Sequence, residues 1–210
     1  KSTKASMGIY IFKTEKLFSY LRSDAQDPAS SNDFGKNIIP NMLNAGEKMM
    51  AYPFKGYWKD VGTISSLWEA NQDLLGEDPE FNIYDSTWKI YSRNMGIEPQ
   101  FIAEGAVVAN SLITSGAKIY GTVINSVIGA SVVVEKGAVV KDSVIFADSV
   151  ISSGAVVNYS ILDEEVVIGE ECVVGSPKDA GVEIAVVGRG TNVAAKSVVA
   201  QGANIEKEDK

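Results

Sequence analysis

The stretch IGASVVVEKGAVVKDSVIF, residues 128–146, repeats an aliphatic or aromatic residue every six positions. The same period returns later in the chain, and its two clearest series are Ile128, Val134, Val140, Phe146 and then Val187, Val193, Val199, Ile205. A period of six fits neither the 3.6-residue turn of a helix nor the two-residue alternation of a single strand. It is typical of a solenoid in which three hexapeptides form one triangular coil, so we expect a left-handed parallel β-helix.

The pattern extends over residues 101–210 with occasional five-residue steps. Its further members are Ile102, Val108, Ile113, Ile119, Ile151, Val157, Leu162, Ile168 and Val174. Each aliphatic residue should point into a narrow prism, while small residues at the corners let the backbone turn. Cys172 occupies a small-residue position, which favours a structural role. We expect about six coils of ~18 residues, interrupted by a loop at GSPKDAG, residues 175–181.

Residues 1–76 follow α/β patterning instead. We expect strands at residues 5–12 and 49–54, a helix at residues 14–24 and a second helix at residues 64–75. Asp33 is a candidate cap for the turn before Pro40, and Thr63 for the second helix, which Gly76 should stop. Residues 77–100 show no period but carry several aromatic side chains, which predicts a crossing segment packed against both flanking parts.

Composition narrows the function. With 210 residues and a formal net charge of −8, the chain lacks the clustered basic residues of a nucleic-acid-binding surface. It holds no run of eighteen apolar residues and no signal-peptide pattern, so we expect neither a membrane partner nor export. A lone cysteine suits a reducing compartment, which favours the cytoplasm. Because the chain begins at Lys1 and runs at once into a strand-like segment, we expect it to be part of a longer polypeptide.

Several motifs occur in a characteristic order: ASMGIYIF at 5–12, NDFGKNIIP at 32–40 and YPFKGYWKDVGTISSLWEAN at 52–71, followed by the hexapeptides. Together they resemble ADP-glucose pyrophosphorylase, also called glucose-1-phosphate adenylyltransferase. The resemblance implies the C-terminal part of a Rossmann-like nucleotidyltransferase domain at 1–76, a crossing segment at 77–100 and the β-helix at 101–210.

The resemblance also implies a site. Glucose 1-phosphate would be bound by Ser6, Tyr10, Asp33, Phe34 and Trp58. Asp60 would be catalytic as one of two carboxylate ligands of Mg²⁺, an ion that prefers oxygen ligands and neutralises phosphate charge. The reaction would join ATP and glucose 1-phosphate into ADP-glucose and pyrophosphate for glycogen synthesis. The family's Gly-rich ATP loop, second metal ligand and Glu-Lys pair do not occur in this sequence, so we expect the chain alone to be inactive.

The resemblance further implies an allosteric enzyme that forms a homo-oligomer, a tetramer in this family. Residues 158–171 carry five acidic residues and no basic one, which argues against a strongly anion-attracting effector site in that segment.

Other interpretations stay open at this stage. Without the surrounding motif, Asp60 would be a turn or capping residue, and Phe34 and Trp58 would be core. Lys36 and Lys59 are interpreted as solvated. A hexapeptide acyltransferase would share the β-helix, but that class often uses a histidine base and this sequence has no histidine. A non-catalytic regulatory subunit, or a GDP-mannose or UDP-glucose type pyrophosphorylase, would share most of the motifs.

Overall fold

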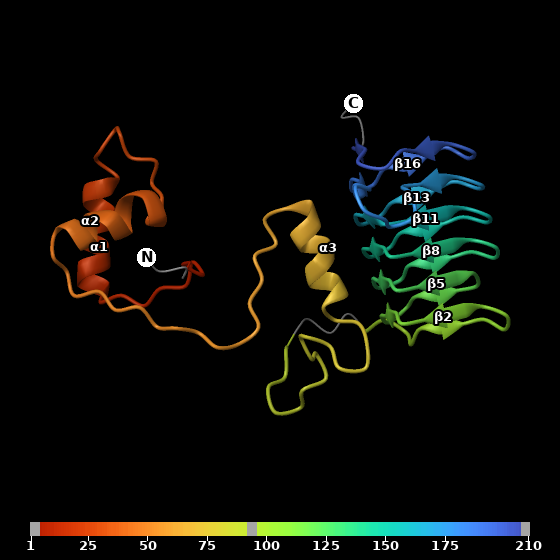
Figure 1. Ribbon diagram of the computed structural model, residues 1–210, viewed down its shortest axis with the longest axis horizontal. Helices are drawn as coiled ribbons and strands as arrows, with labels where there is room; N and C mark the ends of the chain where they lie inside the picture. Colours follow the sequence, from red (N-terminus) through yellow and green to blue (C-terminus); the bar gives the residue numbers. More distant parts are fainter. Residues whose placement is uncertain (1–4, 92–95, 207–210) are drawn as a thin grey trace. The chain divides into compact units, whose positions relative to one another are not determined.

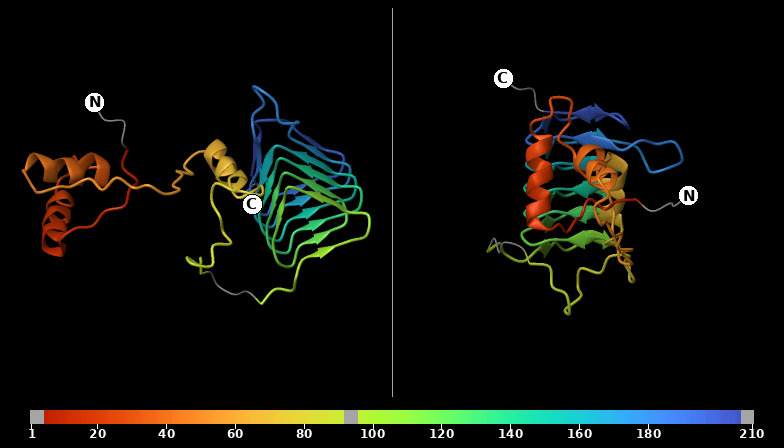
Figure 2. Two further views of the ribbon diagram at one scale, coloured as in Figure 1. Left: turned by 60° about the horizontal axis from the view of Figure 1, so that its bottom comes forward. Right: turned by 90° about the vertical axis from the view of Figure 1, so that its left-hand side faces the viewer.

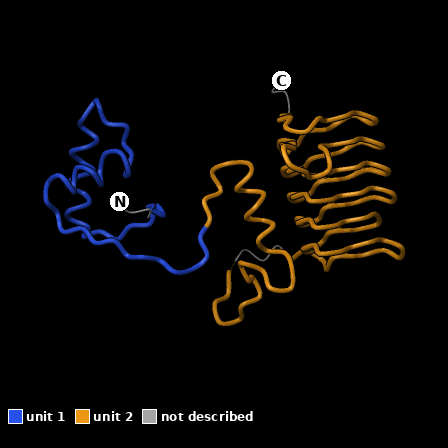
Figure 3. The backbone as a smooth tube through the Cα atoms, in the orientation of Figure 1, with its two compact units in different colours: residues 1–58 blue, residues 59–210 orange. Residues whose placement is uncertain are grey.

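The computed structural model describes residues 5–91 and 96–206. The chain divides into two compact units, residues 1–58 and 59–210 (Figure 3). The described part of unit 1 contains helices joined by irregular segments, and no strand. Unit 2 consists of one helix, an irregular segment and a parallel β-solenoid whose coils stack one on another (Figures 1 and 2).

Unit 1 contains helix α1 (Thr14–Asp24), the π-helical turn η1 (Phe34–Ile38) and helix α2 (Ile39–Asn44). The predicted cap is confirmed, because the Asp33 carboxylate accepts a hydrogen bond from the Lys36 amide at 2.8 Å. Pro40 lies in the first turn of α2, where its missing N–H costs no helical hydrogen bond. Ile38 and Met42 are the buried apolar side chains of this unit's described residues.

The two strands predicted in unit 1 are wrong. Residues 5–12 and 49–54 lie in no strand, and most of their apolar side chains are exposed, Ile11 at 100% and Tyr52 at 88%. A strand needs a hydrogen-bonded neighbour and a buried face. Neither segment has such a neighbour among the described residues, so strand-like composition alone does not produce a strand.

The solenoid of unit 2 is built from three six-stranded parallel sheets within the described residues. The first sheet contains β1 (Phe101–Ile102), β4 (Lys118–Ile119), β7 (Val133–Val134), β10 (Val150–Ile151), β13 (Val167–Ile168) and β16 (Asn192–Val193). The second contains β2 (Val107–Ala109), β5 (Thr122–Ile124), β8 (Val139–Lys141), β11 (Val156–Asn158), β14 (Val173–Val174) and β17 (Val198–Val199). The third contains β3 (Leu112–Ile113), β6 (Val127–Ile128), β9 (Val144–Ile145), β12 (Ser160–Leu162), β15 (Ala185–Val187) and β18 (Asn204–Ile205).

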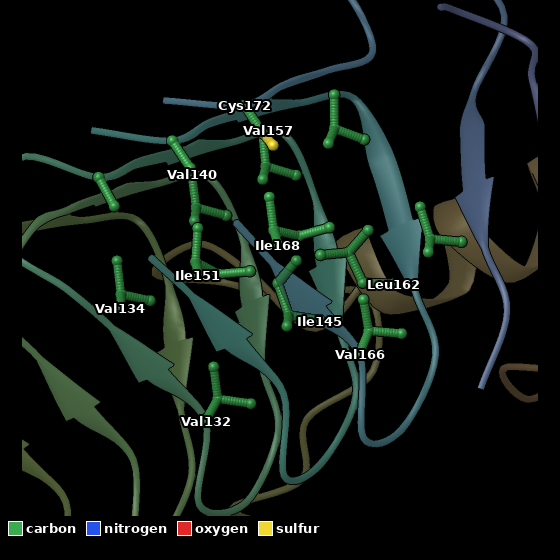
Figure 4. Packing of buried hydrophobic residues seen from close by; sticks show 14 of the residues in the cluster. Val132, Val134, Val140, Ile145, Ile151, Val157, Leu162, Val166, Ile168 and Cys172 are labelled. Atoms are coloured by element: carbon green, nitrogen blue, oxygen red, sulfur yellow. The ribbon is translucent and has the colours of Figure 1, made fainter. Parts of the chain in front are cut away.

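Each coil contributes one strand to every sheet, and its aliphatic residues fill a dry prism (Figure 4). Val134 pairs with Ile151 and Ile151 with Ile168, so these coils are 17 residues apart. The predicted parallel solenoid of hexapeptides is therefore confirmed. The predicted loop at 175–181 is confirmed too, because it lies between β14 and β15.

Phe146 does not take the prism position that the six-residue period predicts. Ile145 is buried in the prism instead, and Phe146 packs on the outer side of the coil. The step from Val140 to Ile145 is five residues because the corner between the second and third sheets is one residue shorter. The same short corner separates Val123 from Ile128.

A serine ladder runs along this short corner. Ser126, Ser143 and Ser160 are fully buried. The Ser143 hydroxyl donates to the Lys141 carbonyl at 2.6 Å and accepts the Ser160 amide at 3.2 Å. The Ser126 hydroxyl accepts the Ser143 amide at 3.1 Å in the same way. Polar groups buried at the corner are thus paired from coil to coil, as buried polar groups need to be.

The second coil is the shortest, since Ile119 pairs with Val134 only 15 positions later. Its first corner contains Gly121, whose added Cβ would lie 2.3 Å from the Ala138 carbonyl oxygen. The tight corner therefore requires glycine.

Helix α3 (Ile64–Gln72) belongs to the solenoid's unit and covers the outer face of the third sheet. Thr63 caps it as predicted, and Thr63 with Ser66 forms a capping box. Packing thus divides the chain at residue 58, whereas sequence patterning divides it at 76 and 100. The domain boundaries at residues 76 and 100 therefore stay a prediction.

The crossing segment is not packed as predicted. Tyr84, Trp88 and Tyr91 are exposed, Trp88 at 83%. Asn82 and Asp85 accept the backbone amides of Tyr84 and Thr87, respectively, so local turns satisfy this backbone. These three aromatic side chains therefore join no buried layer among the described residues, whereas Phe81 is half-buried.

The prism predicts a difference between buried and exposed aliphatic residues. Leu162→Ala, at a fully buried position, should lower the free energy of unfolding by about 2–5 kcal/mol, because it removes apolar contacts and leaves a cavity. Ile90→Ala, at a position 62% exposed outside the solenoid, should change it by less than about 0.5 kcal/mol. Urea denaturation measures both, and equal effects would contradict the prism.

Candidate functional site

The predicted sugar-phosphate residues of unit 1 begin with Ser6 and Tyr10. Their hydroxyl oxygens are 2.9 Å apart, within hydrogen-bonding distance. Gly8 makes the turn between them, with φ +72° and its amide donating to the Ser6 hydroxyl at 3.2 Å. The turn brings the two hydroxyls to one place without a strand, so the predicted pair forms although the predicted strand does not.

An aromatic cluster surrounds Tyr10. The Tyr10 and Phe34 rings stack with centroids 5.8 Å apart and an interplanar angle of 15°. Phe12 lies within 5.8–5.9 Å of both rings. Phe34 also connects this aromatic cluster to Asp33, because Asp33 directly precedes it in the chain. The structure therefore brings Ser6, Tyr10 and Phe34 together, and it adds Phe12, which sequence reasoning missed because the apolar residues of 5–12 were assigned to a strand core.

Asp33 and Trp58 are the remaining predicted residues of unit 1. The Asp33 carboxylate Oδ1 is engaged by the Lys36 amide, so its structural role is that of a cap. Trp58 is 44% exposed at the end of the unit. Each can present a polar edge to a ligand, Asp33 through Oδ2 and Trp58 through its indole N–H.

Asp60 lies in unit 2, in the turn that leads into α3. Its Oδ1 accepts the Gly62 amide at 2.9 Å, and its side chain is exposed. A carboxylate with one oxygen used by a local amide can still offer the other to a divalent cation. Within residues 5–91 and 96–206, no three His, Cys, Asp or Glu side chains group as a metal cluster. Asp60 therefore fits one ligand of a magnesium ion, and the described residues do not form a complete metal cage.

Lys59 is not solvated as predicted. Its ammonium lies 2.7 Å from Asp73 Oδ2 and 3.5 Å from Glu69 Oε2, and its side chain is only 26% exposed. The hydrogen bond to Asp73 is the main cause that raises the pKa of Lys59 above its ordinary value, and the Glu69 carboxylate adds to it. Sequence reasoning missed this contact because Asp73 lies fourteen residues away, at the far end of α3.

Trp68 fixes α3 to the solenoid. Its indole N–H donates to the Asp142 carbonyl at 2.7 Å, and its ring meets Tyr159 edge-on with centroids 4.9 Å apart. The Lys178 ammonium lies 4.3 Å above the Trp68 ring, a cation–π distance. Around this contact the outer side chains of the third sheet, Val127, Val144 and Ile161, are buried, together with Ile184 just before β15. The helix that follows Asp60 is thus docked on three successive coils.

Comparison with known proteins agrees with this architecture. Residues 1–77 match the family model for nucleotidyl transferases, and residues 100–190 match the model for the GlmU-like C-terminal hexapeptide. No described helix is long and apolar enough to cross a membrane. The chain is therefore a nucleotidyl transferase segment joined to a hexapeptide-repeat solenoid.

The more specific relationship comes from curated proteins. The glucose-1-phosphate adenylyltransferase of Clostridium perfringens (strain SM101 / Type A) is 59% identical over 141 residues, which cover 67% of this chain and 36% of that protein. The enzyme of the same name from Clostridium kluyveri is 57% identical over 138 residues, 66% of this chain and 36% of that protein. That from Bacillus cereus is 54% identical over 140 residues, 67% of this chain and 37% of that protein.

Two thirds of the chain is thus homologous to glucose-1-phosphate adenylyltransferases, and the resemblance seen in the motifs is confirmed. The chain spans little more than a third of the length of these relatives.

The docking of α3 predicts that the two tryptophans of unit 2 differ. Trp68→Ala should lower the free energy of unfolding of unit 2 by about 3–5 kcal/mol, because it removes a buried ring and leaves the Asp142 carbonyl without its donor. Trp88→Ala, at an exposed position, is the matched control and should have an effect below about 0.5 kcal/mol. Thermal unfolding followed by circular dichroism measures both, and a harmless Trp68→Ala would show that α3 is not docked as described.

Proposed function

We propose that this chain supplies the glucose 1-phosphate side and the β-solenoid of a glucose-1-phosphate adenylyltransferase. In the proposed reaction, a phosphate oxygen of glucose 1-phosphate attacks the α-phosphorus of ATP. The bond to the β-phosphate oxygen breaks, and ADP-glucose and pyrophosphate leave. No enzyme nucleophile is needed, because positioning and charge neutralisation supply most of the catalysis in phosphoryl-type transfers. ADP-glucose made in this way would serve glycogen synthesis.

The cluster of Ser6, Tyr10 and Phe34 is the observation that carries the proposal. The paired hydroxyls of Ser6 and Tyr10 can donate to and accept from a sugar phosphate. The Phe34 ring against Tyr10 restricts the orientation of that hydroxyl, and Asp33 beside it offers an acceptor for sugar hydroxyls. These are the properties of a polar ligand site with an aromatic wall.

Asp60 is the proposed ligand of Mg²⁺. When bound, the ion would neutralise charge on the transferring phosphates. Asp60 would provide one carboxylate oxygen to it, while the Gly62 amide holds the other oxygen in place. The remaining ligands of the magnesium ion and the ATP site would lie in sequence outside this chain. The chain by itself should therefore form no ADP-glucose.

The direct test is ADP-glucose synthesis by the complete enzyme that contains this chain. Asp60→Asn should lower kcat/KM by about 100-fold, because a neutral amide is a poor ligand for a hard cation. Asp148→Asn is the matched control: Asp148 is exposed at a corner of the solenoid with φ +58°, a conformation that asparagine tolerates. Its activity should stay within twofold of the unsubstituted enzyme. Full activity of Asp60→Asn, or no ADP-glucose from the unsubstituted enzyme, would refute the proposal.

We also propose that the chain forms a homo-oligomer, a tetramer by its resemblance to the family. The support is an apolar outer column on the second sheet, in which Val139, Val156, Val173 and Val198 stand in register. Within unit 2, α3 covers the third sheet and leaves this column exposed at Val198. Uncovered apolar patches on β-sheets commonly mark protein interfaces.

Light scattering tests this proposal on the chain itself. At micromolar concentration the mass should be a multiple of the 22.4 kDa protomer. Val156→Lys should shift the equilibrium toward the protomer, because it places a charge in the middle of the column. A single 22.4 kDa species of the unsubstituted chain would count against self-association.

A further inference from the structure

The residue before Asp60 is tied to α3 by an ion pair. Lys59 contacts Asp73 at 2.7 Å and Glu69 at 3.5 Å, and both carboxylates project from the second half of α3 or its C-terminal cap. Asp73 is only 15% exposed and Lys59 26% exposed. A partly buried ion pair of this kind holds a fixed geometry better than a solvated one, because water screens it less.

The residues after Asp60 are tied to the same helix. The Gly62 amide donates to Asp60 Oδ1, and Thr63 is the N-cap of α3. Thr63 exchanges hydrogen bonds with Ser66, its amide donating to the Ser66 hydroxyl at 3.1 Å and its hydroxyl accepting the Ser66 amide at 3.2 Å. Asp60 therefore lies in a short loop, residues 59–63, that is fastened to α3 at both ends.

Helix α3 is in turn fixed to the solenoid. The Trp68 indole donates to Asp142 at a corner of the third coil. The side-chain amide of Asn125, a residue of the preceding coil, donates to the Asp142 carboxylate at 2.6 Å. A continuous path of short contacts thus runs from Asp60 through Lys59 and α3 to the stacked coils, and every residue in it belongs to one compact unit.

We propose that Lys59 and Asp73 are positioning residues that hold the Asp60 carboxylate at a fixed place on the solenoid. We call the Lys59–Asp73 ion pair the clamp. The inference rests on the proposed function, because the clamp matters for catalysis only if the neighbouring Asp60 is a metal ligand. A solvated lysine could instead meet a substrate phosphate directly. The two short contacts of Lys59 with carboxylates favour positioning, since the ammonium is already engaged. Residues that orient a metal ligand commonly change metal affinity or activity by about 10–100-fold when they are replaced.

Three substitutions in the complete enzyme separate these roles. Lys59→Met keeps the aliphatic stem and removes the charge. It should raise the Mg²⁺ concentration needed for half-maximal activity by about tenfold and leave the KM for glucose 1-phosphate within twofold. Asp73→Asn should have the same effect from the other side of the clamp, which keeps the test valid if one variant folds poorly. Lys59→Arg retains the charge and should behave as the unsubstituted enzyme.

Lys55→Ala is the control, because Lys55 is an exposed lysine of the preceding segment. It should leave the Mg²⁺ requirement unchanged. The inference is overturned if Lys59→Met has a normal Mg²⁺ requirement, if Lys59→Arg is as impaired as Lys59→Met, or if only the KM for glucose 1-phosphate rises, which would indicate direct substrate contact.

Proteolysis of the chain itself distinguishes failure of this inference from failure of the proposed function. Chymotrypsin cleaves after aromatic residues, and Trp58 directly precedes Lys59, while the exposed Trp88 serves as a reference in the same molecule. Lys59→Met should increase cleavage after Trp58 relative to Trp88 several-fold, because it frees the loop. If cleavage increases but the unsubstituted enzyme makes no ADP-glucose, the proposed function fails and the clamp stands. If cleavage after Trp58 does not change, the clamp fails whatever the activity.

Discussion

Burial of one aliphatic residue per strand in the solenoid's prism is the interaction on which the rest of unit 2 depends. Each coil alone would expose its inward residues at both ends, so the apolar surface is removed from water only when coils stack. Stacking at the same time pairs the backbone of every strand with the neighbouring coils, on both sides for the inner strands of each sheet. The flat outer faces and the regular corners follow from this repetition, and α3 docks on one of the faces.

The docking of α3 links this rigid element to the proposed chemistry. Trp68 binds the helix to the corner of a coil, and Lys59 binds the Asp60 loop to the helix. The solenoid can therefore support the proposed metal ligand Asp60 as well as the proposed assembly surface. In unit 1 the proposed sugar-phosphate residues are held differently, by a glycine turn and a small aromatic cluster around Tyr10. The proposed functional residues thus lie in short irregular segments, and the one that contains Asp60 is supported by the solenoid.

The solenoid could be predicted from sequence because its repeat fixes both burial and pairing. The period failed only at corners of unusual length. Phe146 was placed inside because a six-residue step was assumed where the chain takes five, and the serine ladder that marks the short corner was not recognised. The strands of residues 5–12 and 49–54 failed for another reason: a strand depends on a neighbour that local composition does not reveal.

The site residues illustrate the same limit. Ser6, Tyr10 and Phe34 came from family motifs, and the structure brings them together. Phe12 was missed because residues 5–12 were expected to form a strand. The Lys59–Asp73 pair was missed because a contact across fourteen residues is set by tertiary packing rather than by spacing.

Hydrogen exchange of the unsubstituted chain tests the central claim most directly. Amides of the strands between residues 118 and 193 pair between coils, so they should exchange far more slowly than residues 77–91 and than the loop at residues 175–181. Helix α3 should be protected alongside the coils because it is docked on them. Exchange of residues 118–193 as fast as that of residues 77–91 would contradict the stacked prism and, with it, the support proposed for Asp60.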